Sequence, residues 1–465
     1  MRFGDDPQQH VSVTYHLEPS TQHPLWSAAL PALRIPSLDI FRHRSYTQYW
    51  FARWFSTFAV QMQLTAMGWQ VYDSARAHGQ SIAEAAFVLG LVGLAQFLPL
   101  LVLSLFGGQA ADRYNRRLIL VACFAVKAAI ALGLAAASRF GPDIIIPAVF
   151  GAAILAGATN AFMPPAASAL MPMLVPREDL PQGIAWSSLA FQSSLIIGPA
   201  VGGLIYAFGP VVPYSATFVL LLVAGALMLT LKAPKQQPVE DARTLGMIAD
   251  GLRFVWKQKV VLGAISLDLV VVLLAGAVAL LPVFARDILH AGPSELGILR
   301  SAMGVGAASV ALALAVNPLR RRVGFWMFGA TFAFGFATIL FGLSNYLWLT
   351  ALALAVAGGV DMVSVYVRQT LIQLNTPDAM RGRVAAVSFV FISASNELGD
   401  FEAGLMARIF GPVLAVTIGG VAAVIASLGW MRLFPELAKA DGFEPASLPP
   451  EAQSAVSVAQ ETEKT

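Results

Sequence analysis

Long apolar runs are the feature that most constrains this chain. About twelve of them, each of roughly 20 residues or more, follow one another from residue 46 to residue 432. A run of that length crosses the hydrocarbon core of a bilayer as a helix, and lipid admits only helices or closed barrels because every backbone polar group must be paired. The expected spans are 46–72, 83–107, 117–138, 143–168, 183–207, 212–231, 260–285, 293–316, 324–343, 346–370, 385–408 and 411–432.

Composition agrees with an all-α membrane protein. The chain is 57% hydrophobic and 12% charged, whereas about 25% of the residues of a soluble domain are charged. The net charge of +3 gives no case for nucleic-acid binding. The single cysteine, Cys123, lies in an apolar run, so no disulfide framework or metal cluster is expected. No phosphate-binding loop or hydrolytic constellation is visible, and we expect no catalytic residue, no metal and no cofactor.

The spans divide into two bundles of six. The expected bundles are residues 46–231 and 260–432, joined by the longest internal loop, 232–259. We predict that residues 1–45, which lack the apolar core of a signal peptide, form a cytoplasmic segment. Residues 433–465 are rich in Pro, Glu, Ala and Ser and are predicted to be a disordered cytoplasmic tail.

The central loop contains a short amphipathic pattern. Leu245, Ile248, Leu252 and Val255 recur at helical spacing beside basic residues. This pattern predicts a helix lying on the membrane surface, where it ties the two bundles flexibly together; the alternative is a binding site for a partner.

Basic residues predict the orientation. Most Lys and Arg of the short loops follow even-numbered spans, among them Arg116, Arg177 and Arg321. Because cytoplasmic loops carry the excess of basic residues, both termini are predicted to be cytoplasmic in a multi-pass inner-membrane protein.

The two bundles resemble each other in sequence. A shift of 201 residues superimposes several residues of the fifth span of one bundle on that of the other. Repeated halves around a central pathway are typical of alternating-access transporters. The matched pairs include Pro176 with Pro377, Ser194 with Ser395, Gly198 with Gly399, and Gly203 with Gly404.

A charged turn separates spans two and three. The segment Gly108–Arg117 resembles the loop motif of the major facilitator superfamily, with Ala110 for the usual Leu and Asn115 for the second Gly. Asn tolerates a left-handed backbone, so we expect Asn115 to preserve the turn. The resemblance implies the major facilitator fold, with twelve transmembrane helices in two pseudo-symmetric six-helix halves. It also implies a gating latch on the cytoplasmic side; the alternative is that these charges only enforce topology. The latch residues are Gly108, Asp112, Arg113, Arg116 and Arg117.

Span five carries a second motif. The run Gly198-Pro199-Ala200-Val201-Gly202-Gly203 resembles the motif of antiporters and exporters of this superfamily. It predicts a kinked helix that neighbours approach closely, either for simple packing or as a rocking interface. More locally, Val60–Gln63 and Ser395–Glu402 resemble the enterobactin-exporter-like branch of bacterial efflux proteins.

Span one carries a polar stripe. Arg53, Thr57, Gln61 and Thr65 fall at four-residue spacing, which places them on one helix face, and we expect this face to line the substrate cavity. Asp268 in span seven lies at about the depth of Arg53, so we expect these two residues to pair.

Other intramembrane polar groups are further candidates for substrate or ion binding. Span four contributes Asn160 but lacks the basic residue that many proton-coupled drug exporters of the superfamily carry there. Span ten places Asp361 and Arg368 on one face. In span eleven, Glu397 and Asp400 disfavour each other's ionisation, so one of them is a candidate proton carrier; the alternative is structural pairing.

These features predict a monomeric secondary transporter. We expect it to export small amphiphilic molecules, siderophore-like or drug-like, across the inner membrane in exchange for protons. Two alternatives stay open: an uptake symporter of the same fold, and a non-transporting receptor or lipid-handling membrane module.

Overall fold

The structure is a computed structural model that describes residues 38–232, 244–319 and 321–443. These residues belong to one compact unit, Pro36–Thr465. Most of the predicted amino-terminal segment, part of the central loop and the end of the predicted tail lie outside the described residues.

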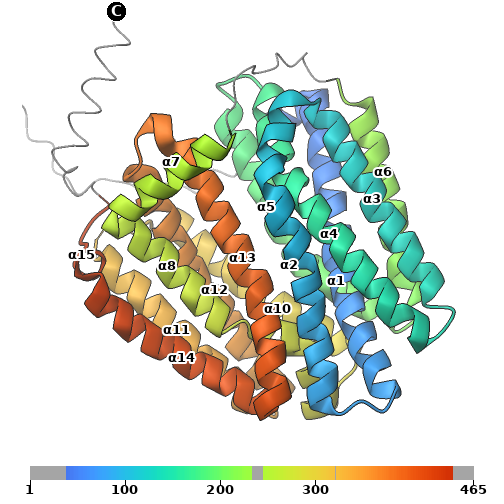
Figure 1. The fold of residues 1–465 in the computed structure, drawn as a ribbon. Helices are drawn as coiled ribbons and strands as arrows, with labels where there is room; N and C mark the ends of the chain where they lie inside the picture. Colours follow the sequence, from blue (N-terminus) through green and yellow to red (C-terminus); the bar gives the residue numbers. More distant parts are fainter. Residues whose placement is uncertain (1–37, 233–243, 320, 444–465) are drawn as a thin grey trace, which may run out of the picture. The chain divides into compact units, whose positions relative to one another are not determined.

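The described chain is helical and follows the predicted spans closely (Figure 1). Eleven spans are continuous helices and one, the seventh, is broken. The first bundle contains α1 (Arg44–Ala77), α2 (Ile82–Arg113), α3 (Arg116–Ala137), α4 (Pro142–Leu170), α5 (Leu180–Tyr206) and α6 (Val211–Thr230). The second contains α8 (Lys259–Leu274), α10 (Pro293–Val316), α11 (Val323–Leu343), α12 (Leu347–Leu374), α13 (Asp378–Phe410) and α14 (Pro412–Leu433).

Ten spans in the described residues are long and apolar enough to cross a membrane by composition alone. The helices α1 and α13 are not among them, because they carry the polar stripe and the carboxylates that the sequence singles out. These two less apolar spans therefore carry candidate residues for substrate or ion binding.

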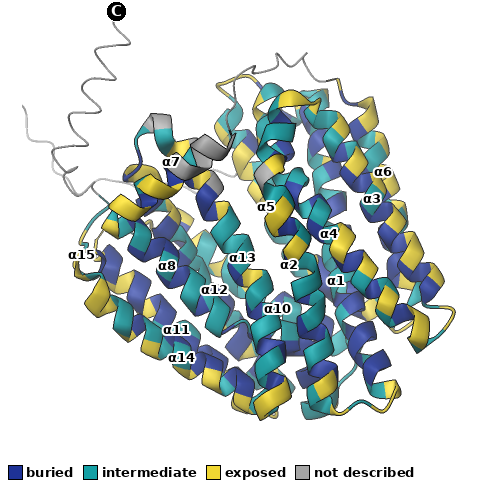
Figure 2. Cartoon of the chain, viewed as in Figure 1, coloured by how far each residue is buried: buried dark blue, intermediate teal, exposed yellow. Residues whose placement is uncertain are grey.

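The outward face of α14 shows how these helices meet lipid. The side chains of Leu414, Ile418, Val421, Ile425 and Leu428 are exposed at helical spacing, and exposed residues follow the outward side of the helix (Figure 2). The opposite face is buried and small: Ala415, Gly419 and Ala423. A helix with large apolar residues outside and small ones inside is suited to lipid on one side and close packing on the other.

The seventh span is not the single helix expected over 260–285. α8 ends at Leu274 and is followed by a 3-10 helix (Ala277–Leu280), the short helix α9 (Leu281–Val283) and a π-helix (Phe284–Ile288). Pro282 lacks the backbone N–H that a continuous helix needs. At Gly276, a Cβ would lie 2.7 Å from the carbonyl carbon of Gly399, so the break also allows close contact with α13.

Glycines mark two of the contacts between the bundles. A Cβ at Gly203 on α5 would lie 3.0 Å from the Cα of Gly297 on α10, and one at Gly404 on α13 would lie 2.7 Å from the Cα of Gly90 on α2. Gly203 and Gly404 are a matched pair of the internal repeat. The two matched glycines therefore occupy equivalent positions, Gly203 where α5 meets α10 and Gly404 where α13 meets α2.

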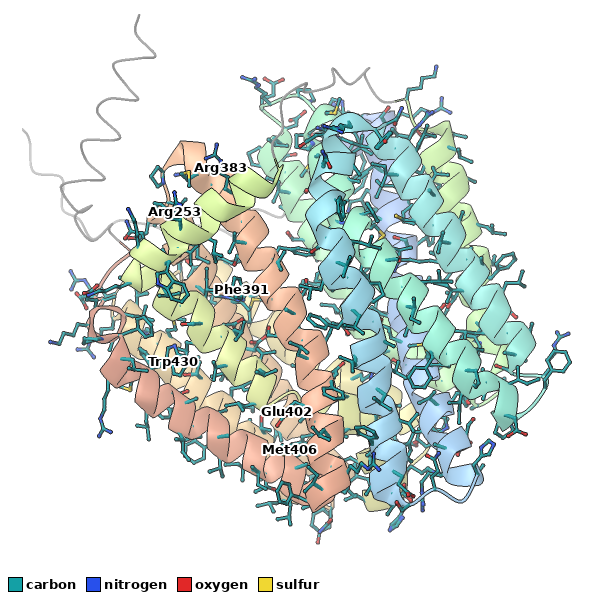
Figure 3. All side chains as sticks on the ribbon, viewed as in Figure 1. Arg253, Arg383, Phe391, Glu402, Met406 and Trp430 are labelled. Atoms are coloured by element: carbon teal, nitrogen blue, oxygen red, sulfur yellow. The ribbon has the colours of Figure 1, made fainter. Side chains whose placement is uncertain are left out.

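The central loop contains the predicted short helix, α7 (Thr244–Lys257). Its Val255 packs with Val384 and Val387 of α13 in one apolar cluster. Arg253 of α7 and Arg383 of α13 lie at the same end of the second bundle (Figure 3). The described part of α7 is thus docked on α13.

The first residues of the predicted disordered tail are ordered. Residues 434–443 pack against the second bundle, where Leu437 is buried in a cluster with α8 and α11. Lys259 pairs with Glu436 at 3.7 Å, and Gly324 N donates to Ala440 O at 2.9 Å. The expectation of disorder from residue 433 is wrong for this stretch because Phe434 and Leu437 cover apolar surface; residues 444–465 lie outside the described chain.

Candidate functional site

The charged turn is mostly helical. α2 continues to Arg113, and only Tyr114 and Asn115 separate it from α3. Asn115 has a φ of −62°, so the expected left-handed residue is wrong. Its Oδ1 instead accepts hydrogen bonds from Arg117 N at 3.0 Å and Leu118 N at 3.4 Å, as a helix N-cap does.

The arginines of the turn contact helix ends. Arg116 Nη1 donates to Ala169 O at 3.0 Å near the end of α4, and Arg116 also faces Asp112 Oδ1 at 3.8 Å. Arg117 Nη1 donates to Leu231 O at 2.7 Å, just after α6. Carbonyls at helix carboxyl ends attract cations. These contacts tie the turn to its own bundle. The latch between the bundles stays a prediction, and its further candidates are Gly108 and the exposed Arg113.

The span-five motif has two faces. A Cβ at Gly198 would lie 3.1 Å from Phe58 O, and one at Gly202 would lie 2.5 Å from Met62 O, both on α1. The opposite side, with Pro199 and Gly203, meets Gly297 of α10 in the other bundle. The geometry therefore serves packing inside one bundle and contact between bundles.

The polar stripe of α1 faces α5 along part of its length. Arg53 and Thr57 line a pocket with Ser187 of α5, and the Cβ of Gln61 lies against Gly198. Thr65 is buried, and its hydroxyl donates to the Gln61 carbonyl at 3.2 Å. Arg53 and Thr57 are the members of the stripe that line a pocket.

The expected pair of Arg53 with Asp268 is wrong. Asp268 Oδ2 pairs with Arg368 Nη1 at 2.5 Å, and the two side chains are 6% and 3% exposed. The reason is helix orientation: α8 packs against α12 within the second bundle, so Asp268 faces Arg368 rather than α1. A similar depth in the membrane does not determine towards which neighbouring helix a side chain points.

A polar cluster surrounds this ion pair. Asp268, Asp361, Ser364 and Thr331 line one pocket in the second bundle. Within the described residues, Ser364 Oγ and Arg368 Nε are buried and lack a hydrogen-bond partner. The cluster therefore contains two carboxylates, one guanidinium and two polar atoms able to bind a further group.

Glu397 and Asp400 lie at the contact between bundles. Gln96 of α2 donates a hydrogen bond to Glu397 Oε1. A Cβ at Gly93 of α2 would lie 2.9 Å from the Cβ of Asp400. Both carboxylates are half-buried, and Glu402, farther along α13 (Figure 3), lines a separate pocket with Leu274 and Ala415.

Arg300 completes this contact and was not identified in the sequence. It lies on α10 and interacts electrostatically with Asp400. Its Nη2 would be 3.6 Å from a Cβ at Gly68 of α1, and its Nε is buried with no hydrogen-bond partner among the described residues. An arginine in an apolar span is itself a signal that identifies such a residue.

Asn160 has a structural partner. Its Oδ1 accepts a hydrogen bond from Lys127 Nζ at 2.9 Å, and Lys127 is 5% exposed. The predicted cavity residue of span four therefore satisfies a buried ammonium group of span three.

Crossed ion pairs join the bundles at the end that holds the α1–α2 loop. Arg286 Nη1 lies 3.0 Å from Asp73 Oδ1, and Arg76 Nη2 lies 3.4 Å from Asp287 Oδ1. Tyr72 also donates a hydrogen bond to Asp287. These contacts connect the end of α1 to the π-helix of the seventh span, and the sequence analysis did not identify them.

Two six-span bundles with glycine contacts between them, a buried ion pair inside one of them and partly exposed ion pairs across them define a membrane transporter of the major facilitator class. Residues 35–463 match the sequence model of the family described as transmembrane secretion effector (MFS_3), and the chain belongs to that family. Its members are transporters, so the chain is a multi-pass transporter and not an enzyme.

Known proteins agree with this assignment. The chain is 28% identical over 352 residues to the enterobactin exporter EntS of Citrobacter koseri, which covers 75% of this chain and 82% of the exporter. The crystal structure of a D-xylose-proton symporter has a TM-score of 0.66 at 15% identity, covering 86% of this chain and 98% of the symporter. A bacterial homolog of the human lysosomal transporter Spinster also has a TM-score of 0.66 at 15% identity, with 85% and 98% covered. The two structures share the fold.

Proposed function

We propose that the protein exports small amphiphilic molecules, siderophore-like or drug-like, across the bacterial inner membrane in exchange for protons. The name of the enterobactin exporters supports export and a siderophore-like cargo. The Gly198–Gly203 segment, which meets both α1 and α10, supports movement of one bundle against the other. The transporter works as a monomer with both termini in the cytoplasm.

One observation carries the coupling mechanism: Glu397 and Asp400 lie where the bundles meet. Glu397 accepts a hydrogen bond from the opposite bundle, and Asp400 lies against it at Gly93. A movement that separates α13 from α2 removes Gln96 from Glu397 and admits water. Because the cost of a buried carboxylate charge depends on its partners and on water, this movement alternates proton binding with proton release.

The same proposal assigns the two ends. With the α2–α3 turn in the cytoplasm, the crossed pairs of Asp73 with Arg286 and Arg76 with Asp287 close the periplasmic side. The charged turn then closes the opposite side when those pairs separate, so each end has its own set of charge contacts.

Inside-out vesicles from a pump-deficient strain test the proposal. Their lumen corresponds to the periplasm, so an exporter accumulates substrate when the lumen is acidified. We expect accumulation with the wild type, its collapse with a protonophore, and loss of the acid-driven part in Glu397→Gln and Asp400→Asn. Arg432→Gln, at an exposed end of α14, is the control.

The alternatives give different results. An uptake symporter accumulates substrate in right-side-out vesicles that are acidic outside, and a receptor or lipid-handling module accumulates nothing in either orientation. Full acid-driven transport in both carboxylate variants would reject these residues as proton carriers while leaving the export direction standing.

A further inference from the structure

A pocket between α1 and α5 combines aromatic walls with a single guanidinium group. Tyr49, Trp50 and Arg53 form one wall, and Ser187 and Phe191 belong to the other. The pocket lies in the first bundle, near the end with the α2–α3 turn. Neither the crossed ion pairs nor the carboxylates of α13 belong to it.

Trp50 of this wall begins a row of aromatic side chains that continues along α1 beyond the pocket lining. Trp50 and Trp54 are stacked with centroids 6.3 Å apart and planes inclined by 7°, and Trp54 and Phe58 follow at 5.7 Å and 18°. Hydrogen bonds fix both indoles: Trp50 Nε1 donates to Trp186 O at 2.8 Å, and Trp54 Nε1 donates to Ser193 Oγ at 3.1 Å. Rigid aromatic faces bind planar rings with little loss of side-chain entropy.

Arg53 supplies an uncompensated positive charge. Its Nη1 is buried and, among the described residues, has no hydrogen-bond partner. Arg53 is in none of the ion pairs that the described residues form. Lys127, whose own hydrogen bond goes to neutral Asn160, interacts electrostatically with Arg53 and adds to the positive potential. The guanidinium also interacts with the hydroxyl of Tyr49, but a neutral hydroxyl does not balance its charge. A buried guanidinium nitrogen without an acceptor is costly, and an anion that supplies one recovers that cost.

We propose that this pocket binds an aromatic anion, and that the exported molecule carries such a group. The ring lies against the indole and phenyl faces, and the anionic oxygens accept hydrogen bonds from Arg53. This inference rests on the proposed function for the identity of the ligand as cargo. A neutral aromatic group leaves the charge of Arg53 unbalanced, and an aliphatic anion leaves the flat walls poorly filled, so both should bind more weakly.

Calorimetry on the purified full-length protein in detergent tests the pocket with three compounds of defined chemistry. The compounds are naphthoate, its neutral amide naphthamide, and cyclohexanecarboxylate. We expect naphthoate to bind the wild type at least about tenfold more tightly than either of the others, as one charge-assisted hydrogen-bonded pair predicts. Equal binding of the acid and the amide would overturn the proposal.

Variants locate the binding. Arg53→Gln should weaken naphthoate by about tenfold or more and weaken naphthamide much less, because the amide carries no charge. Arg53→Lys, which keeps the charge but not the planar fork, should fall between the two. Arg432→Gln, an exposed arginine on α14, is the matched control and should bind as the wild type does. If Arg53→Gln binds naphthoate like the wild type, the anion site lies elsewhere and the proposal fails.

Two further results separate folding and cargo from the pocket itself. Should Arg53→Gln not purify as a monodisperse protein, Ser187→Phe fills the pocket from α5; unaltered naphthoate binding in that variant rejects the site. A wild type that binds naphthoate through Arg53 but exports nothing from vesicles keeps the pocket and rejects the proposed function. If the wild type exports substrate but Arg53→Gln binds naphthoate as tightly as the wild type, the proposed function stands and the pocket is rejected.

Discussion

Arg286 and Asp73 join the two bundles across 3.0 Å, and beside them Arg76 and Asp287 make a second pair in which the charges are exchanged between the bundles. Each side thus contributes one acid and one base. Replacing a single residue leaves a net charge at the contact, and replacing both carboxylates leaves two arginines facing a polar surface. The contact is therefore sensitive to mutation although its pairs are partly exposed.

We predict that Asp73→Asn with Asp287→Asn opens this end more often. Partly exposed ion pairs contribute about 0.2–1 kcal/mol each, so loss of both pairs should raise the open population about twofold to thirtyfold. The measurement is the labelling rate of Ser301→Cys by an impermeant maleimide, because Ser301 is 8% exposed on α10 and the native Cys123 is buried. Unchanged labelling would show that the pairs do not hold this end closed. Asp143→Asn is the control, because Asp143 lies in the first turn of α4 and its partner His78 belongs to the same bundle.

The buried pair of Asp268 with Arg368 predicts a large effect on stability. Asp268→Asn leaves a buried guanidinium without its counter-charge and should lower the free energy of unfolding by about 3–5 kcal/mol. Asp268→Asn combined with Arg368→Met should recover much of that loss. The matched control is Glu436→Gln, which breaks the pair with Lys259, whose side chains are 56% and 72% exposed; it should cost less than about 1 kcal/mol. Denaturant unfolding in detergent micelles measures both, and equal losses would contradict the prediction.

The glycines at the two interfaces predict a transport defect. Gly203→Leu and Gly404→Leu place side chains where the backbone of the other bundle lies, and overpacking of this kind costs about 1–3 kcal/mol in the closed arrangement. We expect substrate accumulation in vesicles to fall about tenfold with normal expression. Gly133→Leu is the control, because a Cβ at Gly133 meets no atom within 4 Å. Normal transport in both interface variants would show that the bundles do not need this close approach.

His78 predicts a pH dependence at the α1–α2 loop. A hydrogen bond to Asp143 at 2.6 Å, followed by the Ser74 carbonyl, raises the pKa of His78 above its ordinary value of 6.5. Because the folded state holds the proton more tightly, the stabilisation is fully present below pH 6.5 and is lost as the pH rises through the raised pKa. The melting temperature of the wild type should exceed that of His78→Gln at pH 6 and match it at pH 9. A difference that grows with pH would contradict this assignment.

Span boundaries were predictable because they depend on the length of apolar runs. Partners inside the bundles were not, because depth along a helix leaves its rotation undetermined. For this reason Asp268 was assigned to Arg53 although it faces Arg368. The contact of Glu397 with Gln96 was also not predictable. Gln96 lies 301 positions away in the sequence, and the residues around it are uniformly apolar. Asn115 illustrates another limit: its side chain supports two turn geometries, and only the backbone angles distinguish the N-cap from the left-handed residue.

The π-helix of the seventh span carries both Arg286 and Asp287. A π-helix has wider turns than an α-helix, and moving one residue along a helix rotates a side chain by about 100°. If the segment tightened into a regular α-helix, both residues would change their direction relative to α1 together. Such a change needs only local rewinding of five residues, so this end can unlock before either bundle has rotated as a body.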